Sequence, residues 1–153
     1  MKKTIFICIG NVILFTLLGL TFLFPFSEII QEDFGLGFSP SVFPFLLLIY
    51  FIAYPIVYHI VAKKYRLAKG ADSELAFSDE REKIIVAEST KVAYKALVGG
   101  LLFIIATIGG VKFFSLFSGV EISIYMTTII LLTILLNVAM VTYCIKWCRE
   151  YKK

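Results

Sequence analysis

Residues 122–145 have the sequence ISIYMTTIILLTILLNVAMVTYCI, an uncharged run that lies between Glu121 and Lys146. As a helix rising about 1.5 Å per residue, this run is roughly 36 Å long, enough to cross a hydrocarbon core of about 30 Å. Three further apolar runs have the same character, at about 4–26, 41–62 and 92–114. The sequence therefore predicts an all-α, polytopic membrane protein, a four-transmembrane-helix bundle forming a single membrane domain over 1–153.

The overall composition agrees with a membrane location. Hydrophobic residues make up 59% of the 153 residues and charged residues only 17%. The charged residues are gathered into a few places with long uncharged stretches between them, which is typical of a protein whose main solvent is the bilayer. The net charge of +4 follows from basic residues that flank the apolar runs and alternate with acids, so it does not indicate nucleic-acid binding.

The positions of lysine and arginine predict the orientation. Of the 15 Lys and Arg residues, all but Lys112 fall before the first run, after the fourth, or around 63–95. The other side of a four-span arrangement carries the acids Glu28, Glu32, Asp33 and Glu121. Basic residues concentrate in cytoplasmic loops. We therefore expect a multi-pass protein of the cell membrane with both termini in the cytoplasm, a cytoplasmic loop at 63–91, and a short outer loop at 27–40.

The third helix is expected to begin well before its apolar run. Ser78 or Asp79 can cap it, Asp79 and Glu82 fit the capping-box spacing, and the acids suit the positive end of the helix dipole. Nothing breaks a helix from there to the glycine pair at 99–100. The sequence thus predicts a third helix extended into the cytosol, with about four exposed turns before the membrane near Lys95.

Charged residues of this extension are candidates for docking a partner: Asp79, Glu80, Arg81, Lys83, Glu88 and Lys91. The plainer interpretation is that they cap and solvate the helix. Lys83 follows Asp79 by four positions and Lys91 follows Glu88 by three, which are ordinary spacings for ion pairs along one helix. Both interpretations stay open at the level of sequence.

The tripeptide Asp79-Glu80-Arg81, with the Ala/Gly-rich span that follows it, resembles a feature of uncharacterised small bacterial four-span membrane proteins that carry an Asp-Glu-Arg signature before the third span. The resemblance covers about residues 50–107. It implies a bacterial source and a gene neighbour of the small DNA-binding regulator type, and it brings no established activity.

Three polar side chains are expected inside the membrane: Asn11, His59 and Asn137. Counted inward from Lys3 and Lys146, Asn11 and Asn137 should lie at similar depth, so we expect them to hydrogen-bond across the bundle. His59 lies about one turn from the cytoplasmic end of the second run. A lone histidine beside lysines is more often structural than a proton relay or pH sensor.

The cysteines Cys8, Cys144 and Cys148 are expected to be reduced thiols near the inner half of the bilayer. Cys144 and Cys148 are four residues apart and so share a helix face. Two thiols without a histidine fall short of the four ligands of a usual zinc site, so no metal site is predicted.

Small residues in the third run, Ala96 with Gly100 and Ala106 with Gly110, permit close approach of another helix. This spacing does not choose between packing within the chain and a homo-oligomer.

No nucleophile with a base, phosphate loop or intramembrane carboxylate is present in the sequence. We therefore expect no enzyme, no catalytic residues and no cofactor. The favoured function is a sensing, regulatory or protective module that docks a cytoplasmic protein through residues 79–91. The alternative is a small transporter or transporter subunit whose path follows the second run, kinked at Pro55, and the polar side chains of the fourth run. An oligomer with an aqueous cavity lined by His59, Thr133 and Asn137 would favour this alternative.

Overall fold

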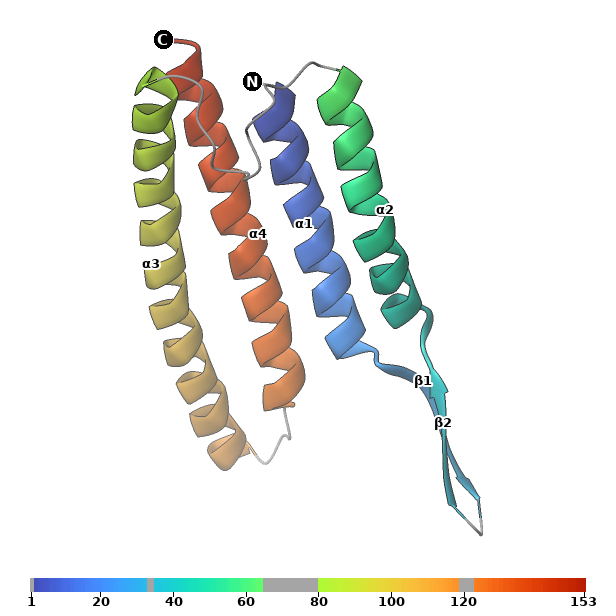
Figure 1. Cartoon of the computed structure of the whole chain (residues 1–153). Helices are drawn as coiled ribbons and strands as arrows, with labels where there is room; N and C mark the ends of the chain where they lie inside the picture. The colour runs from blue at the N-terminus through green and yellow to red at the C-terminus, as the bar shows by residue number, and fades with distance from the viewer. Residues whose placement is uncertain (1, 33–34, 65–79, 119–122) are drawn as a thin grey trace.

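The computed structural model describes residues 2–32, 35–64, 80–118 and 123–153, and four helices account for most of them (Figure 1). All four are long and apolar enough to cross a membrane, which confirms the four predicted helices and is consistent with a multi-pass membrane protein. Their bounds lie within a few residues of those expected, except that the last helix continues well past 145. The helices are α1 (Lys2–Leu23), α2 (Val42–Lys64), α3 (Glu80–Ser118) and α4 (Ile124–Tyr151).

The helices stand in a row rather than around a common core. Figure 1 shows the order α3, α4, α1, α2, and the main contacts join α3 to α4, α4 to α1 and α1 to α2. The predicted four-helix arrangement is therefore an open one, with neighbouring helices packed side by side and no common core. Apolar side chains gain little by leaving lipid for a protein core, so a membrane helix can keep lipid on both sides. Few apolar side chains are buried among the described residues: Ile7, Cys8, Ile85, Ile104, Leu135, Ala139 and Trp147.

Each of the three helix contacts contains a glycine. A Cβ at Gly100 would meet the Leu135 side chain between α3 and α4, and one at Gly19 would meet Thr133 between α1 and α4. A Cβ at Gly10 would meet the Tyr54 ring between α1 and α2. A missing side chain at these positions lets two helices approach closely, which is the usual way that membrane helices gain packing energy.

The two small-residue pairs of α3 have different roles. Gly100, with Ala96 one turn before it, belongs to the contact with α4. By contrast, a Cβ at Gly110 would have no described heavy atom within 4 Å outside its own helix. The pair Ala106 and Gly110 is therefore not used for packing between the described helices of this chain.

A β-hairpin replaces the short loop expected at 27–40. Strand β1 (Phe26–Glu32) pairs antiparallel with β2 (Gly35–Pro40), with an irregularity near Phe26. The hairpin projects beyond α1 and α2 in Figure 1. Pairing two extended segments satisfies backbone N–H and C=O groups that an open loop leaves to water. The composition of residues 27–40 did not predict this pairing.

Ser41 ties the base of the hairpin to the helices. Its backbone N–H donates to the Pro25 carbonyl at 3.1 Å, and its hydroxyl donates to the Phe24 carbonyl. Ser41 is buried. These bonds fix the end of α1 beside the start of α2.

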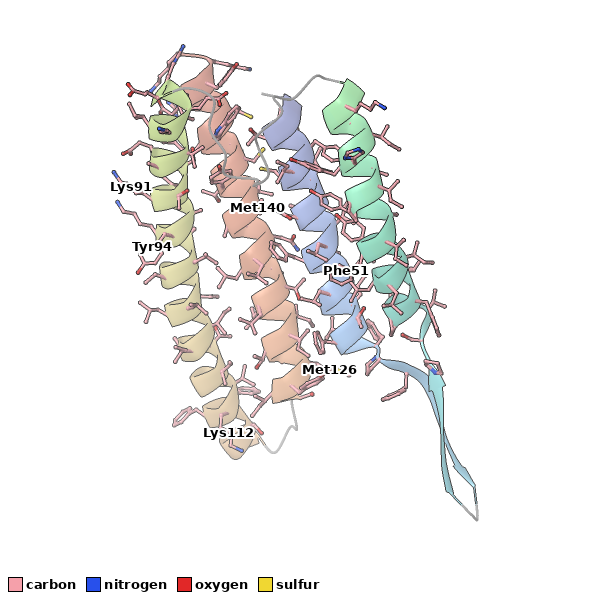
Figure 2. The ribbon with its side chains drawn as sticks, in the orientation of Figure 1. Phe51, Lys91, Tyr94, Lys112, Met126 and Met140 are labelled. Atoms are coloured by element: carbon pink, nitrogen blue, oxygen red, sulfur yellow. The ribbon has the colours of Figure 1, made fainter. Side chains whose placement is uncertain are left out.

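Helix α3 is continuous from Glu80 to Ser118, so the glycine pair at 99–100 does not interrupt it. Its first turn carries Glu80 and Glu82, as expected for a helix N-terminus. The expected caps, Ser78 and Asp79, lie outside the described residues. Figure 2 places Lys112 close to the opposite end of α3 from Lys91.

The start of α3 does not protrude alone. Ser89 is fully buried and Ile85 is 6% exposed, and Trp147 of α4 is 3% exposed at the same end of the row. In Figure 1 the start of α3 and the end of α4 lie at the same level. The expected four exposed turns are therefore exposed on one side only, because α4 continues to Tyr151 and contacts α3.

Candidate functional site

The exposed side of the first turns of α3 holds five residues at helical spacing, here called the docking face: Glu80, Arg81, Ile84, Glu88 and Lys91. All five are exposed. Residues three, four and seven apart share a helix face, which places the other four around Ile84. The opposite side of the same turns carries the buried Ile85 and Ser89. The packing on α4 therefore decides which side of this helix faces outward.

An ion pair orders part of the docking face. The Lys91 ammonium donates to a Glu88 carboxylate oxygen at 2.7 Å, as the spacing predicted. The hydrogen bond and the positive charge of Lys91 lower the pKa of Glu88, which lies outside the apolar run at 92–114. Both side chains are well exposed, so the pair contributes little to stability. The ion pair therefore holds the negative charge of Glu88 and the positive charge of Lys91 side by side on the surface.

Two members of the predicted set are placed differently. Lys83 is exposed, but it precedes Ile84 by one position and so points about 100° away around the helix. It is not part of the docking face. Asp79, and with it the predicted pair with Lys83, lies outside the described residues.

Sequence reasoning missed Ile84, which is 67% exposed. A large apolar side chain ringed by charges is typical of protein interfaces, where a few apolar anchors supply most of the binding energy. The spacing contained the signal, because Ile84 lies four residues from both Glu80 and Glu88. Tyr94, 65% exposed, points away from α4 on the same side as Lys91 (Figure 2).

The intramembrane amide of Asn137 does not meet Asn11. Its Nδ2 donates to the Thr16 hydroxyl at 3.2 Å, between α4 and α1. The predicted contact between Asn11 and Asn137 is wrong because the predicted depth of Asn137 assumed that α4 ends at Lys146. The helix continues, and the Lys146 ammonium turns toward Glu150 at 2.7 Å. Asn137 is therefore opposite a position more than one turn further along α1 than Asn11.

The polar residues of the predicted transport path are not brought together in one chain. Thr133 packs against Gly19 between α4 and α1. His59 is exposed on α2, which contacts α1 from the other side. The arrangement gives His59 and Asn137 no common site, so no observation on the described residues favours the transporter alternative.

We expect Asn137→Leu to change the free energy of unfolding by less than about 1 kcal/mol, because hydrogen bonds between membrane helices contribute about 0.6 kcal/mol on average. The Asn137 Oδ1 atom is buried without a hydrogen-bond partner, which further limits the loss. Unfolding of the purified chain in detergent, with Thr16→Val as the matched variant, measures this. Loss of the folded state in Asn137→Leu would contradict the assignment of a minor structural role.

A tyrosine ladder that was not predicted joins α2 to α1. Tyr50, Tyr54 and Tyr58 follow at four-residue spacing, and the Tyr50 and Tyr54 ring centroids are 5.3 Å apart. Phe6 stacks on Tyr54 at 6.0 Å, and the Tyr50 hydroxyl donates to the Gly10 carbonyl at 2.6 Å. The regular spacing is visible in the sequence and could have indicated the side of α2 that packs.

Cys8, Cys144 and Cys148 are free cysteines in the part of the chain that the structure describes. Within the described ranges, no three His, Cys, Asp or Glu side chains are placed to hold a metal ion.

The fold and this surface define a multi-pass helical membrane protein with one charged, partly apolar helix face at the end of the row where both chain termini lie (Figure 1). No protein-family profile, curated protein or solved structure matches the chain.

Proposed function

We propose that the chain is a non-enzymatic membrane module that binds a cytoplasmic protein through the docking face of α3. One observation carries the proposal: Ile84 is 67% exposed among Arg81, Glu88 and Lys91, although the other side of the same turns is buried. An exposed isoleucine side chain lowers the solubility of the surface around it unless another apolar surface covers it. A partner with an apolar pocket rimmed by charges of both signs fits this face.

The proposed orientation places the docking face in the cytoplasm. Arg81, Lys83 and Lys91 of α3 and Arg149, Lys152 and Lys153 of α4 lie at the end of the row where the termini lie, and Lys112 lies toward the other end. Basic residues are retained on the cytoplasmic side during insertion. This supports both termini in the cytoplasm and the hairpin outside.

The class of process follows from the resemblance of Asp79-Glu80-Arg81 to small bacterial four-span proteins. Genes of such proteins often lie beside small DNA-binding regulators, which supports a bacterial sensing, regulatory or protective role. A membrane protein with a rigid cytoplasmic helix can hold a soluble regulator at the membrane and release it when the membrane changes.

Site-specific photocrosslinking in native membranes tests the proposal. A photoreactive phenylalanine derivative in place of Ile84 is expected to give a discrete crosslinked protein. The same derivative in place of Ile105 is the matched control, because Ile105 is equally exposed, at 66%, on the apolar part of the same helix. We expect no protein crosslink from position 105.

A second substitution tests whether the crosslink at position 84 depends on a neighbouring charged residue. Arg81→Ala should reduce the crosslink at position 84 several-fold, because Arg81 lies beside Ile84 and arginine is enriched at interface hot spots. Lys112→Ala, at the far end of α3, should leave it unchanged. Equal crosslinking at positions 84 and 105, or none at either, would contradict docking through this face.

A further inference from the structure

Two thiols lie together at the end of α4. Cys144 and Cys148 are one helical turn apart on the same face of α4, and both are partly exposed. They lie among the basic residues Lys146, Arg149 and Lys152 at the end of the helix. Two partly exposed thiols held on one face of a rigid helix are chemically distinct from single surface cysteines.

The third cysteine lies close by but differs in access. Gly19 packs on Thr133, and moving three turns along both antiparallel helices from that contact leads to Cys8 and Cys144. Cys8 is 3% exposed, whereas Cys148 lies one turn further out. Figure 2 shows sulfur atoms gathered between α4 and α1 in this part of the row. The accessible pair is therefore Cys144 with Cys148, and Cys8 provides a matched control.

The geometry of the pair favours one kind of chemistry. A direct S–S bond is only about 2.05 Å long, and residues four apart in a rigid helix lie near the upper limit of the Cα separation that it tolerates. A zinc ion needs four ligands. A trivalent arsenic atom forms one bond to each of two sulfurs, so it can bridge thiols one helical turn apart without requiring the sulfurs to approach to S–S bonding distance.

We propose that Cys144 and Cys148 form a dithiol site that binds trivalent arsenicals. With a monosubstituted arsenoxide, two S–As bonds form and the As=O bond breaks. The two thiol protons leave with that oxygen as one water molecule. Arsenic stays trivalent and no oxidant is consumed. This site is separate from the docking face and does not depend on the proposed partner.

The only tryptophan of the chain reports on this site. Trp147 is the neighbour of Cys148 in the sequence, is 3% exposed, and stacks on Tyr151 with ring centroids 4.8 Å apart. A bridge between residues 144 and 148 constrains the turn that carries Trp147. Binding is expected to change the tryptophan fluorescence.

The test is a titration of the purified full-length chain with phenylarsine oxide. We expect one phenylarsenic group per chain by intact mass, protection of Cys144 and Cys148 from maleimide, and a fluorescence change that saturates at one equivalent. A dithiol competitor such as 2,3-dimercaptopropanol should reverse all three.

Variants assign the site. Cys144→Ser and Cys148→Ser should each weaken binding by about a hundredfold or more, because a second thiol on the same turn acts at an effective concentration in the millimolar range or above. Cys8→Ser should bind like the wild type. Circular dichroism confirms that each variant keeps its helices. Retained binding in Cys148→Ser, loss in Cys8→Ser, or no protection of either thiol would overturn the proposal.

Discussion

Replacing Gly19 with valine is expected to separate α1 from α4 and to destabilise the chain by about 3 kcal/mol, the upper end of the usual cost of overpacking. A Cβ at Gly19 would lie 2.6 Å from Thr133 Cγ2 and 2.9 Å from Thr133 Cβ. The backbone fixes the position of a Cβ, and the branched side chain of valine is also restricted at χ1, so the helix backbones must move apart. Separation of α1 from α4 also moves Asn137 out of hydrogen-bond distance of Thr16.

The matched control is Gly109→Val on α3, where a Cβ would meet no described heavy atom within 4 Å outside its own helix. Because valine is a better helix former than glycine, this variant should be neutral or slightly more stable. Unfolding in detergent, followed by circular dichroism, measures both. Equal stability of the Gly19→Val and Gly109→Val chains would show that α1 and α4 do not pack through Gly19.

Trp147→Ala is expected to cost about 3 to 5 kcal/mol, the usual range for removing a buried aromatic side chain. Trp147 is 3% exposed at the end of the row where Ser89 and Ile85 of α3 are also buried. Loss of the indole should loosen the first turns of α3 from α4. Hydrogen exchange at residues 80–91 is expected to increase, with less effect at residues 100–110.

Tyr151→Ala is the control for this prediction. Tyr151 stacks on Trp147 but is 40% exposed, so its removal should cost no more than about 1.5 kcal/mol, the upper value for an aromatic pair. If Trp147→Ala leaves hydrogen exchange at residues 80–91 unchanged, the prediction that Trp147 of α4 holds the first turns of α3 in place is wrong. If exchange increases, the photocrosslink from position 84 should weaken as well, because the presented face is no longer fixed.

The sequence by itself determined how many helices the described chain has and roughly where they lie. A membrane helix satisfies its own backbone hydrogen bonds, so an uncharged run of sufficient length is almost enough to specify one. The Glu88 and Lys91 pair could also be predicted, since both partners lie on one turn of one helix and their spacing is a local property of the sequence. The orientation stays a prediction from the distribution of lysine and arginine.

Only the tertiary structure decided how the helices pack. The row order, the partner of Asn137, the contact of Gly19 with Thr133 and the burial of Ser89 all join residues far apart in the sequence. In lipid no hydrophobic force distinguishes an inner from an outer side of an apolar helix, so periodicity carries little information about contacts. Packing is decided by the shapes of two surfaces that meet, such as a glycine facing a threonine. Ile84 is exposed for the same reason, because the packing of α3 on α4 left this side chain outside the contact.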